Sequence, residues 1–225
     1  MTPAPVGPAP IAGVPMPWRS GHRIISARST PESAFERIAT PREAQALLRI
    51  VQAGRPPRVE PADVGIAPGA GWVMAAFLRG GSARFNDESF GAFYAAESIE
   101  TAISETQFHY GRFLREADEG PTHLGLRSLR PEFEANPLDL RGRQGTHPDL
   151  YDPDPARYAD AQAWAALERA RGVDGVLYDS VRRAAGECVA VFRPRCVVTC
   201  LDGERIIYEW DGRRFTRTFR GTETQ

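Results

Sequence analysis

Short apolar segments separated by turn residues limit the fold of this chain most strongly, because they are typical of strands in a sheet. In the second half of the sequence we predict strands over residues 122–128, 174–179, 187–192 and 196–201. One helix, at about 156–171, is expected among them. This pattern predicts a core made mostly of β-structure.

The end of the chain carries a hairpin signal. Residues 205–210 and 213–220 both read as strands, and Asp211-Gly212 stands between them. An Asp-Gly pair is a standard two-residue turn between antiparallel strands. A strand at 22–27, near the other end, would carry Arg23.

Two helices are predicted before residue 54. Thr40 can cap a helix over 41–53, with Pro41 at its first position, Glu43 completing a capping box and Gly54 ending it. Thr30-Pro31 repeats the start signal, without the glutamate, for a helix over about 31–39. Residues 54–71 are rich in Pro and Gly and are expected to form a loop. The apolar segment 72–78 fits a buried helix or a strand equally well.

The middle of the chain combines two short strands with a long helix. We predict strands at 82–85 and 90–95 around the polar turn 86–88. Ser98 then caps a helix reaching about Ala117. Its expected apolar face consists of Ile99, Ala102, Ile103, Thr106, Tyr110 and Phe113.

These elements predict a single α+β domain over residues 18–225 with a mostly β core and a C-terminal hairpin. Residues 1–17 contain six prolines among small residues and are expected to be a disordered or extended tail. They lack the basic start and the apolar stretch of a signal peptide. No apolar run approaches the roughly 18 to 20 residues that span a bilayer. We therefore expect a cytoplasmic protein that does not enter a membrane.

The charge composition excludes several classes of function. The formal net charge is -1, without a long basic run, which argues against a nucleic-acid partner. Every basic residue is arginine, so there is no Walker A lysine and no Schiff-base lysine. If the protein binds phosphates, arginine side chains or backbone amides must hold them.

The cysteines and histidines do not show the spacing of a metal site. Cys196 and Cys200 have no second pair after them, and Cys188 stands apart. Buried free thiols are the simpler interpretation. The four histidines also lack ligand spacing, and we predict no bound metal. His109 is the one to follow, because it shares a helix face with Glu105.

Residues 80–109 bring together an arginine, an aromatic-rich segment and a helix with a carboxylate, which suits a nucleotide pocket. Arg84 could grip a pyrophosphate with two donors, or it could pair with a surface carboxylate. Tyr94 could stack on a flat ring, or it could belong to the core. Glu105 could be a catalytic carboxylate, or a solvated helical glutamate. Ser180 follows a predicted buried strand at a turn, where ligand contacts are common, but without a serine-hydrolase elbow.

The same residues resemble the pattern of the RES-domain family. The run 81–86 (GSARFN) and the run 93–105 (FYAAESIETAISE) are similar to its arginine-aromatic-asparagine and tyrosine strands and to its alanine-glutamate helix. His22-Arg23-Ile24 is similar to its first arginine block. Residues 172–180 and 186–192 resemble its serine block and closing strand. The resemblance covers roughly residues 20 to 215, with the blocks in the family's order.

The resemblance implies an ADP-ribosyltransferase-like fold and NAD as a substrate rather than a resident cofactor. RES proteins are toxins of two-gene toxin–antitoxin systems, masked by an Xre-family antitoxin, with toxin pairs joined in the larger complex. Arg23 and Arg84 would hold the pyrophosphate or ribose of NAD, and Tyr94 would face the nicotinamide half. Glu105 would be the catalytic carboxylate, and Ser180 would hydrogen-bond the substrate.

Three positions depart from the family pattern. Ile24 stands where some relatives carry an aromatic residue, so stacking on a base would fall to Tyr94, Phe85 or another ring. Cys188 replaces a small polar residue, and Asp179 replaces a common proline. The segment between the two arginines and the sequence after residue 104 resemble the longer branch of the family, which includes protein ADP-ribosyltransferases.

We therefore expect a toxin that cleaves NAD and transfers ADP-ribose to a protein acceptor. NAD degradation by hydrolysis or phosphorolysis is the alternative within enzymes, because the two differ only in the acceptor. A third hypothesis is an inactive module that binds NAD or the antitoxin, and a fourth is an α+β domain without NAD chemistry.

Overall fold

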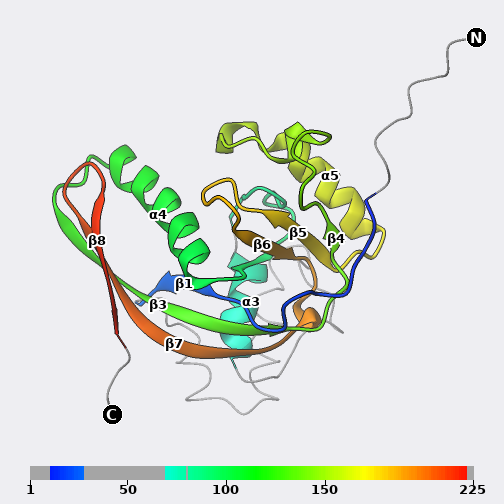
Figure 1. Ribbon diagram of the computed structural model, residues 1–225, viewed down its shortest axis with the longest axis horizontal. Helices are drawn as coiled ribbons and strands as arrows, with labels where there is room; N and C mark the ends of the chain where they lie inside the picture. The colour runs from blue at the N-terminus through cyan, green and yellow to red at the C-terminus, as the bar shows by residue number, and fades with distance from the viewer. Residues whose placement is uncertain (1–10, 28–68, 80, 222–225) are drawn as a thin grey trace, which may run out of the picture.

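The computed structural model describes residues 11–27, 69–79 and 81–221, which form two four-stranded sheets (Figure 1). The first sheet has the order β1-β3-β7-β8 and is antiparallel throughout. Its strands are Arg23–Ser26, Thr122–Phe133, Val197–Trp210 and Phe215–Gly221. The predicted helices at 31–39 and 41–53, and most of the predicted loop 54–71, lie outside the described residues.

The second sheet has the order β2-β6-β5-β4, and only its last pair is parallel. Its strands, in that order, are Phe93–Ala96, Glu187–Val191, Gly175–Asp179 and Leu138–Asp139. The helices are α3 (Ala70–Arg79), α4 (Ile99–Glu116) and α5 (Ala159–Ala170). The described residues also form three short 3-10 turns, η2 (Pro148–Leu150), η3 (Pro155–Arg157) and η4 (Pro194–Cys196). The predicted α+β class with a mostly β core is confirmed.

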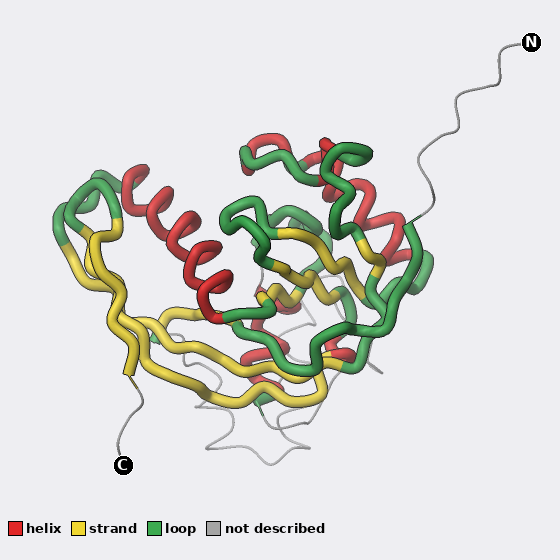
Figure 2. The backbone as a smooth tube through the Cα atoms, viewed as in Figure 1, coloured by secondary structure: helices red, strands yellow, loops and turns green. Residues whose placement is uncertain are grey.

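The hydrophobic core is built on the long, bent strands β3 and β7, which run side by side in Figures 1 and 2. Alternate residues of β7 point inward, so that Ile206, Tyr208 and Trp210 are at most 1% exposed. The sequence predicted two strands in this region, 196–201 and 205–210, but they form one. The predicted terminal hairpin is confirmed. Its turn is longer than predicted, because the Asp211 carboxylate accepts hydrogen bonds from the backbone of both Arg213 and Arg214.

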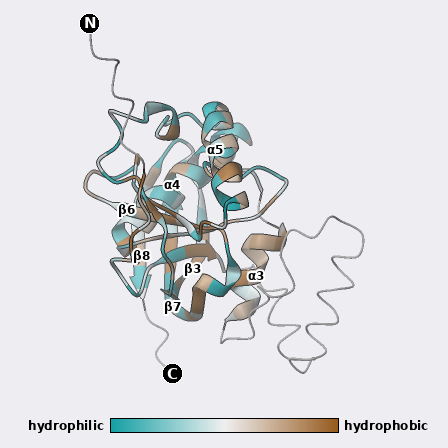
Figure 3. Ribbon diagram, turned by 90° about the vertical axis from the view of Figure 1, so that its right-hand side faces the viewer, coloured by the Kyte–Doolittle hydropathy of each residue, from teal (hydrophilic) through white to brown (hydrophobic). Residues whose placement is uncertain are grey.

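The ambiguous apolar segment 72–78 lies within α3. This helix packs on β7 and β2 and is largely apolar (Figure 3). Val73, Met74 and Phe77 are at most 4% exposed, which explains why the segment has little polar face. The predicted loop 54–71 is wrong at its last two residues, because Ala70 and Gly71 already belong to α3.

The two sheets meet at the start of β1. His22 and Ala96 exchange two backbone hydrogen bonds of 2.8 Å, which join the first sheet to the end of β2. Gly21 permits the approach, because a Cβ atom there would lie 2.7 Å from the Trp18 ring and 3.0 Å from the Ala96 carbonyl oxygen. This junction places Arg23 beside β2.

Helix α4 begins as predicted. Ser98 caps it by accepting a hydrogen bond from the Thr101 amide at 3.3 Å. The predicted apolar face is wrong at its far end, where Phe113 is 64% exposed and Leu114 is 5% exposed. The hairpin of β7 and β8 packs near Gly111, so the covered side of the helix turns towards that strand pair.

One further prediction needs correction, and for part of the tail the structure agrees with one of the two predicted forms. Residues 82–85 are not a strand: they form a turn closed by a bridge between Ala83 and Asn86, because the buried Asn86 amide bonds carbonyls on both sides of it. Residues 11–17 of the predicted tail are ordered in extended form. Val14 and Met16 donate backbone hydrogen bonds to the carbonyls of Pro137 and Ala135.

Gly91 is predicted to tolerate no side chain. A Cβ atom there would lie 2.4 Å from the Phe77 Cα atom of α3, and backbone cannot move aside cheaply. We expect Gly91→Ala to destabilise the fold by about 1–3 kcal/mol, measured by urea unfolding. Gly125→Ala is the matched control, because nothing lies within 4 Å of its Cβ position. Equal stability of the two variants would contradict the close packing of α3 on β2.

Candidate functional site

A cavity of about 360 Å³ opens at the junction of the two sheets. Its wall contains Arg23 from β1, Arg84 from the turn before β2, Tyr94 from β2 and Glu105 from α4. Four of the five residues selected from the sequence therefore meet in one space. The fifth, Ser180, reaches that space through its bond to Glu105.

The Tyr94 hydroxyl organises the turn that carries Arg84. It donates to the Asn86 Oδ1 atom at 2.8 Å and accepts from the Phe85 amide at 2.9 Å. Asn86 is 1% exposed, and its Nδ2 atom donates to the Gly81 and Phe90 carbonyls. Burial raises the pKa of Tyr94, so the phenol stays protonated near neutral pH. The sequence identified Tyr94 as a ring that faces a ligand, but its hydroxyl also has a structural role.

Arg84 is 5% exposed, and its guanidinium already has neutral partners. Its Nη1 atom donates to the carbonyls of Leu150 and Asp152, at 3.1 and 2.8 Å. Its Nη2 atom donates to the Tyr158 hydroxyl at 3.1 Å, and the guanidinium carbon lies 4.5 Å from the centre of the same ring. None of these partners carries a negative charge, so the positive charge of Arg84 remains available to an anion in the cavity.

Arg23 is held at the opposite sheet. Its Nη1 atom donates to the Tyr94 carbonyl at 2.8 Å, and its guanidinium carbon lies 4.8 Å from the centre of the Phe93 ring. Burial lowers the pKa of Arg23 from its ordinary value, but a guanidinium remains charged in proteins. Backbone and ring contacts thus fix a second cation in the cavity wall.

Glu105 faces these cations as a partly buried carboxylate. Its Oε1 atom accepts a hydrogen bond from the Ser180 hydroxyl at 2.5 Å, and the Cys188 thiol lies 3.9 Å from the same oxygen. Desolvation by burial raises the pKa of Glu105, while the Ser180 hydrogen bond and the charges of Arg182 and Arg84 oppose this shift. The Glu105 carboxylate is therefore fixed in orientation by Ser180 and only weakly hydrated.

Ser180 is fixed by its own turn. Its Oγ atom accepts from the amides of Arg182 and Arg183, both at 3.1 Å, so the hydroxyl proton is left for Glu105. The Ser180 amide donates to the Gly186 carbonyl at 2.7 Å, which closes the loop 180–186. In this structure, Ser180 positions Glu105 rather than lining the cavity.

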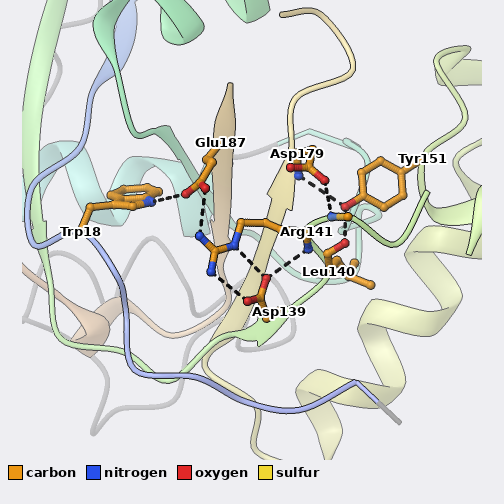
Figure 4. Close-up of polar contacts among 8 residues, drawn as sticks. Trp18, Asp139, Leu140, Arg141, Tyr151, Asp179 and Glu187 are labelled. Atoms are coloured by element: carbon orange, nitrogen blue, oxygen red, sulfur yellow. Dashed lines mark hydrogen bonds and ion pairs between the residues drawn. The ribbon is translucent and has the colours of Figure 1, made fainter. Parts of the chain in front are cut away.

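A charged network lies at the base of this loop, where β6 begins (Figure 4). Arg141 forms ion pairs with Asp139 at 2.8 Å and with Glu187 at 2.9 Å. The Trp18 indole donates to Glu187 at 3.2 Å. Glu187 begins β6 and is followed by Cys188 in the cavity wall, so the network fixes the strand beside Glu105.

The sequence did not predict the roles of three residues at or beside the site. Asn86 was interpreted as a turn residue and as part of the family motif, without a role of its own, although it is the buried centre of the Arg84 turn. Tyr158 lines the cavity from the start of α5, and Arg182, in the loop 180–186, donates a hydrogen bond to the Tyr158 hydroxyl. An isolated tyrosine or arginine in a polar segment gives no local signal. Phe85 is fully buried against Trp164 and Tyr178 and therefore cannot stack on a ligand base.

The remaining candidates have simpler roles. His109 lies in the cavity wall at an exposed position of α4. The three cysteines are buried and form no disulfide with one another, as predicted. Across the described ranges, no cluster of three His, Cys, Asp or Glu residues could hold a metal ion. None of the described helices is long and apolar enough to cross a membrane.

Comparison with known proteins identifies the family. The model of the RES domain matches residues 58–211, about two thirds of the chain, so this protein belongs to the RES-domain family. No curated protein matches it significantly. A similar solved chain comes from the crystal structure of the M. tuberculosis MbcT–MbcA toxin–antitoxin complex. The two are 13% identical with a TM-score of 0.43, over 94% of this chain and 87% of that chain.

The Tyr94 hydroxyl is predicted to contribute to stability. In Tyr94→Phe the buried Phe85 amide and the Asn86 oxygen both lose their partner, which costs about 1–3 kcal/mol in the free energy of unfolding. Tyr110→Phe is the control, because no hydrogen bond joins its hydroxyl to the described residues. We expect this control to stay within about 0.5 kcal/mol of the wild type by urea unfolding. A Tyr94→Phe protein as stable as the control would contradict the role of this hydroxyl.

Proposed function

We propose that this protein binds NAD in the cavity between the two sheets, breaks the nicotinamide–ribose bond and transfers ADP-ribose to a protein acceptor. Membership of the RES-domain family supports NAD as the substrate class. The observation that carries the proposal is the position of Glu105, a partly buried carboxylate that shares one cavity wall with two fixed arginines.

The residues of the cavity suit NAD chemically. A dinucleotide carries a diphosphate, and Arg23 and Arg84 supply cations whose present partners are carbonyl groups, a hydroxyl and rings. Tyr94, Tyr158 and Tyr178 contribute aromatic surface to the lining, which suits flat heterocycles. A volume of about 360 Å³ lies within the usual range for small-molecule sites.

The proposed chemistry begins with cleavage of the bond between the ribose C1 atom and the nicotinamide nitrogen. The bonding electron pair leaves with nicotinamide, which becomes neutral, and the sugar acquires oxocarbenium character. Glu105 stabilises that positive charge, because a fixed carboxylate in a water-poor site acts more strongly than one in water. An acceptor oxygen or nitrogen then bonds to C1 and releases its proton to Glu105 or to water. Ser180 keeps the carboxylate aimed during both steps.

Hydrolysis or phosphorolysis of NAD is the second candidate. It uses the same bond cleavage with water or phosphate as the acceptor, and none of the cavity residues named above selects among acceptors. Transfer to protein is preferred because the sequence resembles the longer branch of the family. A catalytically inactive binding module would have no need for an aimed carboxylate at Glu105.

We further propose that the protein is a toxin neutralised by a cognate antitoxin of the Xre family, as the family resemblance implies. A partner that covered the cavity wall around Arg84 and Glu105 would block access of NAD. Pairing of two toxin chains within the toxin–antitoxin complex belongs to the same proposal.

Glu105→Gln tests the cleavage step. The amide keeps the size of the side chain and can still accept from Ser180, but it cannot stabilise positive charge on the sugar. We expect the rate of nicotinamide release from NAD to fall by about 10²–10⁴. Glu100→Gln is the matched control on the same helix, because Glu100 is half-exposed and pairs with Arg220 at the surface. Equal rates in the two variants would remove Glu105 from the mechanism.

The acceptor is tested with NAD labelled in its adenylate half. Incubation of the wild-type protein with a bacterial lysate and this substrate is expected to label one or a few proteins, and Glu105→Gln should label none. The label is followed by gel electrophoresis, with free ADP-ribose measured in the same sample. Nicotinamide release accompanied only by small labelled products would reject transfer to protein and support hydrolysis or phosphorolysis.

A further inference from the structure

Two arginines converge on one neutral hydroxyl at the edge of the cavity. The Tyr158 Oη atom accepts a hydrogen bond from Arg84 Nη2 at 3.1 Å and another from Arg182 Nη2 at 3.4 Å. Like charges that share a single acceptor repel one another. No carboxylate in the described part of the chain lies within ion-pair distance of either guanidinium. An anion beside Tyr158 would relieve this repulsion.

Contacts from two other segments hold Arg182 in this place. Its guanidinium carbon lies 3.3 Å from the centre of the Phe108 ring on α4, and Nη2 also donates to the Pro153 carbonyl. Stacking on a ring fixes the plane of a guanidinium and leaves its edge free to face an anion. Arg182 therefore spans from the loop 180–186 to α4 and to the segment before α5.

The backbone of Arg182 is tied to the proposed catalytic carboxylate. Ser180 Oγ accepts from the Arg182 amide and donates to Glu105, so one hydroxyl sets the position of both. The charge of Arg182 also acts on Glu105, where it opposes the rise in pKa that burial causes. Arg182 is thus close enough to Glu105 for its positive charge to stabilise the charged form of that carboxylate.

We infer that Arg182 is an additional diphosphate ligand, which acts with Arg84 to form a two-guanidinium site around the Tyr158 hydroxyl. This inference rests on the proposed function and adds a residue to it. The Tyr158 oxygen occupies the place where the two donors converge, and a phosphate oxygen with its negative charge is a stronger acceptor for both. The substrate class that fits is a nucleoside diphosphate ester, in preference to a nucleoside or a monophosphate.

The inference is tested by the binding of ADP-ribose and adenosine to the full-length protein, measured by calorimetry. ADP-ribose carries the diphosphate, whereas adenosine does not. We expect Arg182→Gln to weaken ADP-ribose binding by about 10- to 100-fold, the loss of a charge-assisted contact, and to leave the adenosine affinity within about twofold. Arg182→Lys should fall between the wild type and Gln, because an ammonium keeps the charge but loses the planar fork.

Arg183→Gln is the matched control. Its side chain is exposed, while its amide bond to Ser180 is unaffected by the substitution. We expect it to bind both ligands as the wild type does. Unchanged ADP-ribose affinity in Arg182→Gln would overturn the inference. Equal weakening of ADP-ribose and adenosine would also overturn it, because that result indicates a damaged cavity rather than a lost phosphate contact.

Binding and cleavage are read separately, so the two proposals can fail independently. If the wild type releases nicotinamide while Arg182→Gln binds ADP-ribose normally, NAD cleavage is supported and the assignment of Arg182 as a diphosphate ligand is rejected. If Arg182→Gln loses only ADP-ribose affinity while the wild type never releases nicotinamide, the diphosphate site stands and cleavage falls. A wild-type protein that neither binds ADP-ribose nor releases nicotinamide overturns both.

Discussion

The two backbone hydrogen bonds between His22 and Ala96 fix the geometry on which the cavity depends. They join two sheets that otherwise share no strand, at the point where Gly21 allows the chains to approach. Arg23 follows this junction on one sheet, and Tyr94 precedes it on the other. Helix α4 starts three residues after Ala96 and carries Glu105 back over the same opening. A shift of one sheet against the other would therefore separate all three side chains.

The site combines several fixed cations with a single catalytic candidate of opposite charge. Arg23 and Arg84 are held by carbonyls, a hydroxyl and aromatic rings, which orient them without neutralising them. Glu105 is oriented by Ser180, a neutral donor, and not by an arginine within ion-pair distance. Neutral partners keep the charges of these side chains available for a ligand. Burying the side chains without an opposite charge beside them costs free energy of folding. Such a site is expected to gain stability when an anionic ligand binds.

Hydroxyl groups of three residues position the charged groups. Tyr94 holds the turn of Arg84, Tyr158 lies between Arg84 and Arg182, and Ser180 connects Glu105 to the Arg182 backbone. Because a hydroxyl can donate one hydrogen bond and accept others, it can join two segments that are distant in sequence. The arginines and the glutamate are thus parts of one connected network, so single substitutions in it should not be additive.

The sequence by itself determined the α+β class, the terminal hairpin, the capped helix with Glu105 and the candidate block from Arg84 to Glu105. These depend on local rules: strand-length apolar runs, an Asp-Gly turn, a serine cap and a contiguous motif. Only the tertiary structure decided that residues 82–85 form a turn, because the Asn86 amide bonds carbonyls that no periodicity reveals. It also decided the partners of Ser180 and the positions of Tyr158 and Arg182, whose contacts lie 24 to 75 residues away in sequence. Contacts at that separation follow from the packing of the two sheets. The spacing of residues along the chain does not predict them.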